Sequence, residues 1–185
     1  MEELSKKKSN IDTRRLVLTG MLFAIALVLS VVEDFFPPLP IPVPGVKFGL
    51  SNIAVMYALF FLKRSQAYTL AVLKSAFVLI TRGLIAAALS FSGGILSLTV
   101  MLFLMILFKD KVTYLILSIF GAIAHNIGQL IVITIIYSGM YLWAYLPVLL
   151  VSGAAAGVIT AVLLKAVLPA LSKALSANQR GEDHV

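Results

Sequence analysis

The sequence contains no cysteine and only eight aspartate or glutamate residues among its 185 positions. The absence of cysteine excludes disulfides, thiolate metal sites and cysteine nucleophiles, and it leaves the redox compartment open. Charged residues make up 12% of the chain, against about 25% in an ordinary soluble domain. The chain therefore lacks the polar surface that a water-soluble globule of this size requires.

Motifs for catalysis or for cofactor binding are also missing. No Gly-x-x-x-x-Gly-Lys-Ser/Thr phosphate loop is present, so the chain has no means of hydrolysing ATP by that route. The aspartates are isolated from one another, which leaves metal-bridged diphosphate chemistry without support. The second histidine, His184, lies in the polar C-terminal tail, far from His125. We therefore expect no catalytic residue, no cofactor and no metal site, and a protein that binds rather than reacts.

Hydrophobic residues account for 61% of the chain and gather in long runs. A membrane-spanning helix needs about 20 predominantly apolar residues, and the runs predict six such helices. The expected spans are 16–32, 46–62, 67–91, 95–108, 112–137 and 143–168. The fold class is thus an all-α, polytopic membrane bundle over residues 16–168, between a basic N-terminal tail at 1–15 and a C-terminal tail at 169–185.

The positions of lysine and arginine predict the orientation of this bundle, because cytoplasmic loops favour them. Twelve of the fifteen basic residues fall on one side: five in the N-terminal tail, four in the second and fourth connections, Lys63-Arg64 and Lys109-Asp110-Lys111, and three toward the C-terminus, Lys165, Lys173 and Arg180. Both termini are therefore expected in the cytoplasm of a multi-pass protein of the cell membrane. Ser92-Gly93-Gly94 is expected to form an outer turn. The net charge of +7 is mostly a topology signal and does not indicate nucleic-acid binding.

The first outer connection is rich in proline and apolar. Residues 33–45 hold five of the seven prolines, which exclude a helix and favour a stiff, extended segment. Such a loop either closes over the bundle as a lid or simply connects two helices. The lid residues are expected to be Glu33, Asp34, Phe35, Phe36, Pro44 and Gly45.

Ionisable residues within apolar spans indicate a functional site, because a charge at bilayer depth is unfavourable. Lys74, Thr81 and Arg82 share one side of the third predicted helix, and no carboxylate lies within the spans. A bound anion would balance the two cations. The alternative is that Arg82 and Lys74 reach the outer and inner interfaces with their long side chains.

Two further segments carry polar groups of the kind that a ligand head group needs. His125, Asn126 and Gln129 lie in the middle of the fifth predicted helix, where they either contact a ligand or hold helices together. Lys47 and Asn52 flank the glycine-containing start of the second helix, which resembles an anion-receiving helix N-terminus or forms a simple turn. We predict a substrate site made from these residues with Lys74, Thr81 and Arg82.

Small residues recur at four-residue spacing in the first and sixth helices, where they allow close helix packing in lipid. Gly153 and Gly157 are expected to pack within the bundle. On the first helix, the small residues are expected to contact a partner membrane protein: Gly20, Ala24, Ala26 and Ser30.

Several of these segments together resemble a known family. The residues are Glu33 to Pro37, Pro44 to Ile53, Ser92-Gly93-Gly94, and Gly121 to Leu130 with its His-Asn-x-Gly-Gln element. They resemble the bacterial Gx transporter family, also called heptaprenyl diphosphate synthase component I. The six helices, the long first outer loop and the basic N-terminus are similar to the substrate-binding S components of energy-coupling factor (ECF) transporters.

The resemblance implies two functions. As an S component, the chain would take up a small, acidic vitamin-like molecule or a quinone or isoprenoid precursor. A transmembrane coupling subunit and two cytoplasmic ATPases would be its partners. The alternative is a non-catalytic membrane accessory component of a heptaprenyl diphosphate synthase. We expect uptake, because the polar groups converge on the outer half of the bundle and the inner loops offer little docking surface.

Overall fold

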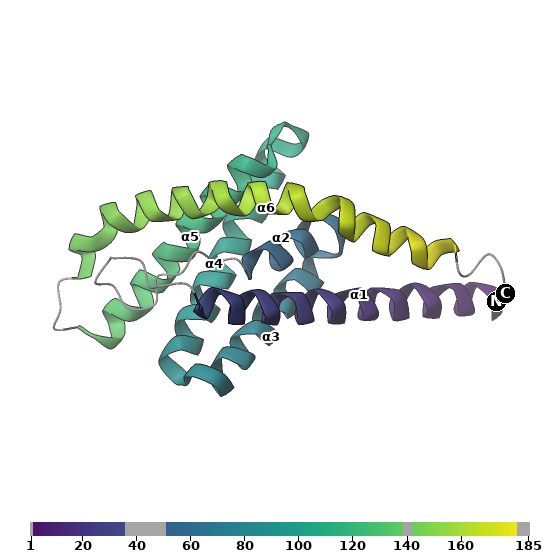
Figure 1. Cartoon of the computed structure of the whole chain (residues 1–185), viewed down its shortest axis with the longest axis horizontal. Coiled ribbons are helices and arrows are strands. Elements are labelled where there is room, and N and C mark those ends of the chain that lie inside the picture. Colours follow the sequence, from purple (N-terminus) through teal and green to yellow (C-terminus); the bar gives the residue numbers. More distant parts are fainter. Residues whose placement is uncertain (1, 36–50, 139–141, 181–185) are drawn as a thin grey trace.

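The computed structural model describes residues 2–35, 51–138 and 142–180, and over these ranges it contains helices and no strand. Six α-helices follow one another along the chain (Figure 1). They are α1 (Glu2–Asp34), α2 (Asn52–Phe61), α3 (Arg64–Arg82), α4 (Leu84–Phe108), α5 (Tyr114–Ile136) and α6 (Leu146–Arg180). Two short 3-10 helices precede α5 and α6, η1 (Lys109–Lys111) and η2 (Leu142–Tyr145). The predicted all-α fold is confirmed.

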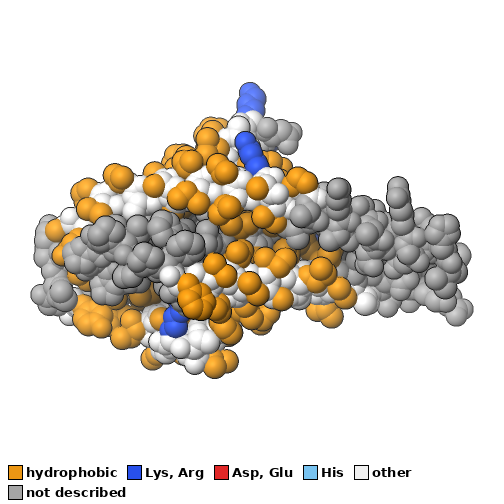
Figure 2. Space-filling model, viewed as in Figure 1, with side chains coloured by type: hydrophobic (Ala, Val, Ile, Leu, Met, Phe, Trp, Pro, Cys, Tyr) orange, Lys and Arg blue, Asp and Glu red, His pale blue; other side chains and the backbone are white. Residues whose placement is uncertain are grey.

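Three helices are long and apolar enough to cross a membrane: α4, α5 and the segment Leu142–Pro169 that contains most of α6. The apolar parts of α1, Leu16–Val32, and of the described α2 are shorter. Figure 2 shows hydrophobic side chains over most of the described surface in that view, with only a few Lys or Arg groups among them. A surface of this kind is stable in lipid and not in water, and the chain is a multi-pass membrane protein.

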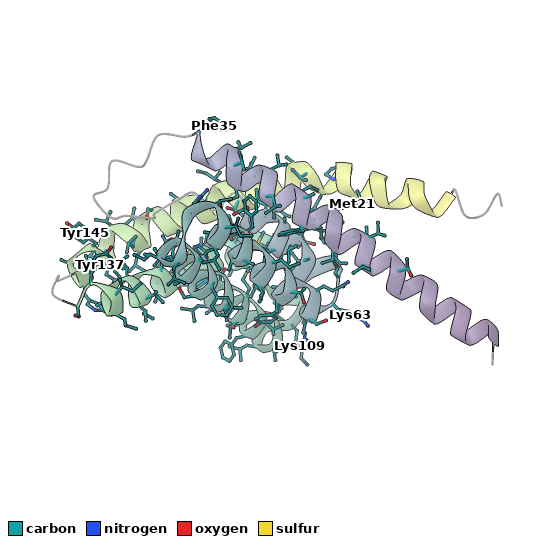
Figure 3. The ribbon with its side chains drawn as sticks, turned by 90° about the horizontal axis from the view of Figure 1, so that it is seen from below. Met21, Phe35, Lys63, Lys109, Tyr137 and Tyr145 are labelled. Atoms are coloured by element: carbon teal, nitrogen blue, oxygen red, sulfur yellow. The ribbon has the colours of Figure 1, made fainter. Side chains whose placement is uncertain are left out.

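The helices pack in sequence order around one short central helix. α3, α4, α5 and α6 each contact the next, and α2 contacts α1, α3, α4 and α6. α1 lies against α2 and α3. Although α1 and α6 run alongside each other in Figure 1, the view from below in Figure 3 shows them diverging. Neither long helix is therefore a close partner of the other.

α2 is buried on all sides. Every residue from Ile53 to Leu59 is buried, and Ser51 before them is only 1% exposed. A helix that is apolar all round belongs in an interior, and this one has four helical neighbours. Its ten described residues extend about 15 Å, roughly half the thickness of a bilayer core. Asn52, the first residue of this helix, is half-buried.

The boundary between the third and fourth helices corrects the sequence prediction. α3 ends at Arg82 and α4 begins at Leu84, so the expected spans 67–91 and 95–108 are wrong. The break falls at Gly83, whose φ of 84° is accessible to glycine and rare for other residues. Ser92-Gly93-Gly94, expected to be a turn, lies inside α4. Gly93 allows α4 to approach His125 of α5 closely instead.

The polar N-terminus and the start of the proline-rich loop also differ from expectation. α1 begins at Glu2, so the expected tail at 1–15 is helical, and α6 likewise continues to Arg180. Glu33 and Asp34 belong to the end of α1, and Phe35 after them is exposed. The remaining predicted lid residues, Phe36, Pro44 and Gly45, lie outside the described residues, as does Lys47.

The connections separate toward two ends of the molecule. Figure 3 places Lys63 and Lys109 near each other at the lower edge of the view, away from Tyr137 and Tyr145 at the left. Lys109 follows the last residue of α4 with a positive φ of 49°, and η1 forms the connection there. In Figure 1, the first residues of α1 and the last residues of α6 lie at the same end.

Candidate functional site

The predicted site residues that the structure brings into direct contact are Lys74 and Asn52. Lys74 lies near the middle of α3 and is 8% exposed, and its Nζ donates a hydrogen bond to Asn52 Oδ1 over 2.8 Å. The contact joins a cation to a neutral amide at the start of the central helix. Hydrogen bonds to an ionised group are the stronger ones, and a buried charge requires such partners.

His125 lies close to this pair. It is near the middle of α5 and 8% exposed, and the charge of Lys74 acts on its ring. Its Nδ1 atom is buried and has no hydrogen-bond partner in the part of the chain that the structure describes. The ring faces Gly93 of α4, where a Cβ atom would come within 2.8 Å of Nδ1. A buried lysine and a buried imidazole thus lie near a half-buried amide, between α2, α3, α4 and α5.

The neighbours of His125 on α5 have different roles. Asn126 is 5% exposed, and its Nδ2 donates to the Leu149 carbonyl of α6 over 2.9 Å. In the structure, Asn126 therefore bonds α5 to α6, as one of the two alternatives predicted. Gln129, one turn after His125, is half-buried, and its side chain makes no hydrogen bond among the described residues. Gln129 is therefore the amide on this helix that is available to a ligand.

Thr81 and Arg82 lie apart from the buried group. Thr81 is exposed, and its hydroxyl donates to the Phe77 carbonyl one turn earlier. Arg82 is half-buried, and its Nη2 donates to the Ser30 carbonyl near the end of α1 over 3.3 Å. A cation near the C-terminal carbonyls of a helix is stabilising, so Arg82 joins α3 to α1. The predicted stripe of three residues is not one continuous site.

The small residues of α1 divide between two faces. Gly20 and Ala24 are exposed, and a Cβ atom on Gly20 would meet nothing within 4 Å. Ala26 is fully buried and Ser30 is 4% exposed. The prediction that all four contact a partner is therefore wrong for Ala26 and Ser30, which pack inside this chain.

Close glycine contacts hold α4, α5 and α6 together and so position His125. A Cβ atom on Gly128 would lie 2.8 Å from the Ser92 carbonyl oxygen, and one on Gly157 would lie 2.5 Å from Ile119 Cα. Gly153 approaches Asn126 and Ile123 in the same way. The prediction that Gly153 and Gly157 pack within the bundle is confirmed.

Three buried hydroxyl residues near Asn52 were not singled out from the sequence: Ser97 of α4, Ser118 of α5 and Thr160 of α6. Serine and threonine are frequent in membrane helices, where they usually bond to their own backbone, so their presence alone carried no signal. In the described part of the chain, no three His, Cys, Asp or Glu side chains are placed to hold a metal ion.

Comparison with known proteins adds a family and a fold. Residues 22–167 match the family model described as heptaprenyl diphosphate synthase component I. The curated proteins give no match. Among solved structures, the chain is similar to one described as "Structure and mechanism of the S component of a bacterial ECF transporter". The TM-score is 0.55 at 22% identity, over 91% of this chain and 98% of that one.

The two comparisons agree with the resemblance in the sequence. At 22% identity the structural likeness shows the fold, which is that of an ECF transporter S component. The family match extends over most of the chain and includes the residues of α2 to α5 that form the buried polar group. The chain belongs to the heptaprenyl diphosphate synthase component I family.

Proposed function

We propose that this protein is the membrane-embedded, substrate-binding subunit of an uptake system in the bacterial cell membrane. The observation that carries the proposal is the hydrogen bond between the buried Lys74 and the half-buried Asn52, with the buried His125 near Lys74, inside an apolar helical bundle. Ionisable groups within an apolar membrane bundle are energetically unfavourable, so their presence there indicates a functional site. The S-component fold of the similar structure supports a role in binding a substrate.

The proposed substrate is a small molecule with an acidic group, of vitamin-like or quinone- or isoprenoid-precursor type. Lys74 would balance its negative charge, and the His125 ring and the Gln129 amide would orient its polar atoms. Arg82, Lys47 and Thr81 stay predicted contacts of the substrate, while Asn126 bonds to the Leu149 carbonyl. The segment 33–45 would close over the bound molecule.

The energy for uptake would come from partners. The chain has no phosphate loop, so two cytoplasmic ATPases would act through a transmembrane coupling subunit. The exposed side of α1, with Gly20 and Ala24, is the proposed contact for that subunit. Both termini of the chain would then lie in the cytoplasm.

Native mass spectrometry of protein purified from its own membranes tests the substrate proposal. A retained small acid is expected on the unaltered chain and not on the Lys74→Met variant. Lys165→Met is the matched control, because Lys165 is exposed on α6 and far along the chain from the buried group. Retention of the same acid by both variants would contradict the proposal.

The family description favours a second candidate, a non-catalytic membrane accessory component of a heptaprenyl diphosphate synthase. The two candidates predict different partners. Affinity purification from native membranes would recover ATPases and a membrane coupling subunit in the first case. In the second it would recover a soluble prenyl synthase, and deletion of this chain would abolish the long-chain product.

A further inference from the structure

A small cavity lies inside the bundle where α2, α4, α5 and α6 meet. Its lining includes Asn52, Ser97, Ser118 and Thr160, together with the side chains of Met56 and Met101. The cavity has a volume of about 20 Å³ for the centre of a water molecule. One water requires roughly 10–15 Å³ on that measure, so the space is sufficient for one.

The three hydroxyl side chains at this cavity behave differently from most others in the helices. Ser75, Thr99 and Thr134 each donate to the carbonyl four residues earlier, which is the usual solution within a helix. Ser118 Oγ is fully buried and has no partner in the described chain. Ser97 and Thr160 are 5% and 6% exposed, and their hydroxyls make no hydrogen bond among the described residues.

A buried hydroxyl without a partner is unfavourable, and Ser118 Oγ is such a group, with two more hydroxyls of buried residues at the same cavity. We propose that the cavity is a binding site for an ordered water molecule, held by the hydroxyls of Ser97, Ser118 and Thr160 and by the Asn52 amide. Water fits this site because it donates and accepts, as the hydroxyls do. A buried water typically makes about three hydrogen bonds, which is the number that the hydroxyls supply.

Asn52 connects this water to the lysine. Its Oδ1 accepts from Lys74, and its side chain also lines the cavity. The water would therefore hydrogen-bond to the amide that accepts from Lys74. Through this water, the first residue of α2 would be connected to α4, α5 and α6.

Radiolytic footprinting of the full chain in lipid nanodiscs tests the site. A short X-ray pulse produces hydroxyl radicals from bound water, and methionine beside such water is oxidised even when it is buried. Met56 and Met101 are 2% and 3% exposed and line the cavity, whereas Met105, one turn along α4, is half-buried and does not. We expect Met56 and Met101 to oxidise faster than Met105. Oxidation that follows exposure, with Met105 fastest, would overturn the proposal.

A cavity-filling variant gives a second measurement. A Cβ atom on Gly121 would point at Met101 Sδ, 2.9 Å away, and at Ser97 Oγ, 3.2 Å away, so Gly121→Ala would occupy the cavity. We expect the oxidation of Met56 to fall by about threefold or more when the water is displaced. Gly94→Ala is the control, since its Cβ atom would meet only Ala71 Cβ at 3.7 Å. Unchanged oxidation in a folded Gly121→Ala variant would also overturn the site.

Discussion

Gly93 of α4 and His125 of α5 meet face to face, with no room for a side chain at residue 93. A Cβ atom there would lie 2.8 Å from His125 Nδ1 and 2.9 Å from the His125 backbone oxygen. Gly93→Ala should therefore push α4 and α5 apart and lower the free energy of unfolding by about 1–3 kcal/mol. Thermal unfolding in detergent measures this loss. Gly94→Ala, with 3.7 Å to its nearest neighbour, should show no comparable loss.

Asn126 and Gln129 should separate stability from binding. Asn126→Ala removes the hydrogen bond to the Leu149 carbonyl and leaves that carbonyl without this donor. Interhelical hydrogen bonds in membranes contribute about 0.6–1.7 kcal/mol, so a loss of unfolding free energy in that range is expected. Gln129→Ala removes no hydrogen bond within the described chain and should preserve stability while weakening ligand retention. Equal effects of the two variants on stability would contradict this division.

The sequence predicted the kind of fold better than it predicted the helix boundaries. Long apolar runs require helices in lipid, and the run at 112–137 corresponds closely to α5. Ser92-Gly93-Gly94 was expected to be a turn because glycine favours both turns and close helix crossings. Which of the two it forms depends on the neighbour, here His125, and the neighbour is a property of the tertiary structure.

The site shows the same limit. Lys74 and His125 could be predicted as site residues because ionisable groups are rare in apolar helices. Both are buried in the structure. Helical spacing placed Arg82 with Lys74, but α3 ends at Arg82 and its side chain reaches α1. The exposure of Gly20 and the burial of Ala26 on one helix likewise depend on where α2 and α3 lie.

Lys74 and Asn52 should be energetically coupled. Asn52→Leu removes one acceptor of the buried Lys74 ammonium, and a loss of unfolding free energy of about 1.5–3 kcal/mol is expected, as for other hydrogen bonds to charged groups. Lys74→Met removes the charge as well, so adding Asn52→Leu to Lys74→Met should have a much smaller effect. A double-mutant cycle with chemical unfolding measures the coupling, expected at about 0.5–3 kcal/mol. Additive effects would show that the hydrogen bond contributes nothing to stability.

Gly157 and Gly20 should respond in opposite directions to the same substitution. A Cβ atom on Gly157 would lie 2.5 Å from Ile119 Cα and 2.9 Å from the Ser118 carbonyl oxygen. Both are backbone atoms, which cannot move away by a side-chain rotation. Gly157→Ala should thus force α5 and α6 apart and lower the unfolding temperature. Gly20→Ala meets nothing within 4 Å, so it should leave stability unchanged or raise it by up to about 1 kcal/mol through helix propensity.

Arg82 offers a final test, because its bond to α1 and its proposed contact with an anion predict different results. Arg82→Lys keeps the charge but loses the planar, five-donor group that reaches the Ser30 carbonyl. If the guanidinium mainly joins α3 to α1, the variant should unfold at a lower temperature and retain its ligand as the unaltered chain does. If Arg82 also binds the anion, ligand affinity should fall with Arg82→Gln and largely recover with Arg82→Lys, since an anion in lipid responds first to charge. If the unaltered chain, Arg82→Gln and Arg82→Lys retain the ligand equally, Arg82 is not part of the substrate site, and Lys74 is the cation that binds the anion.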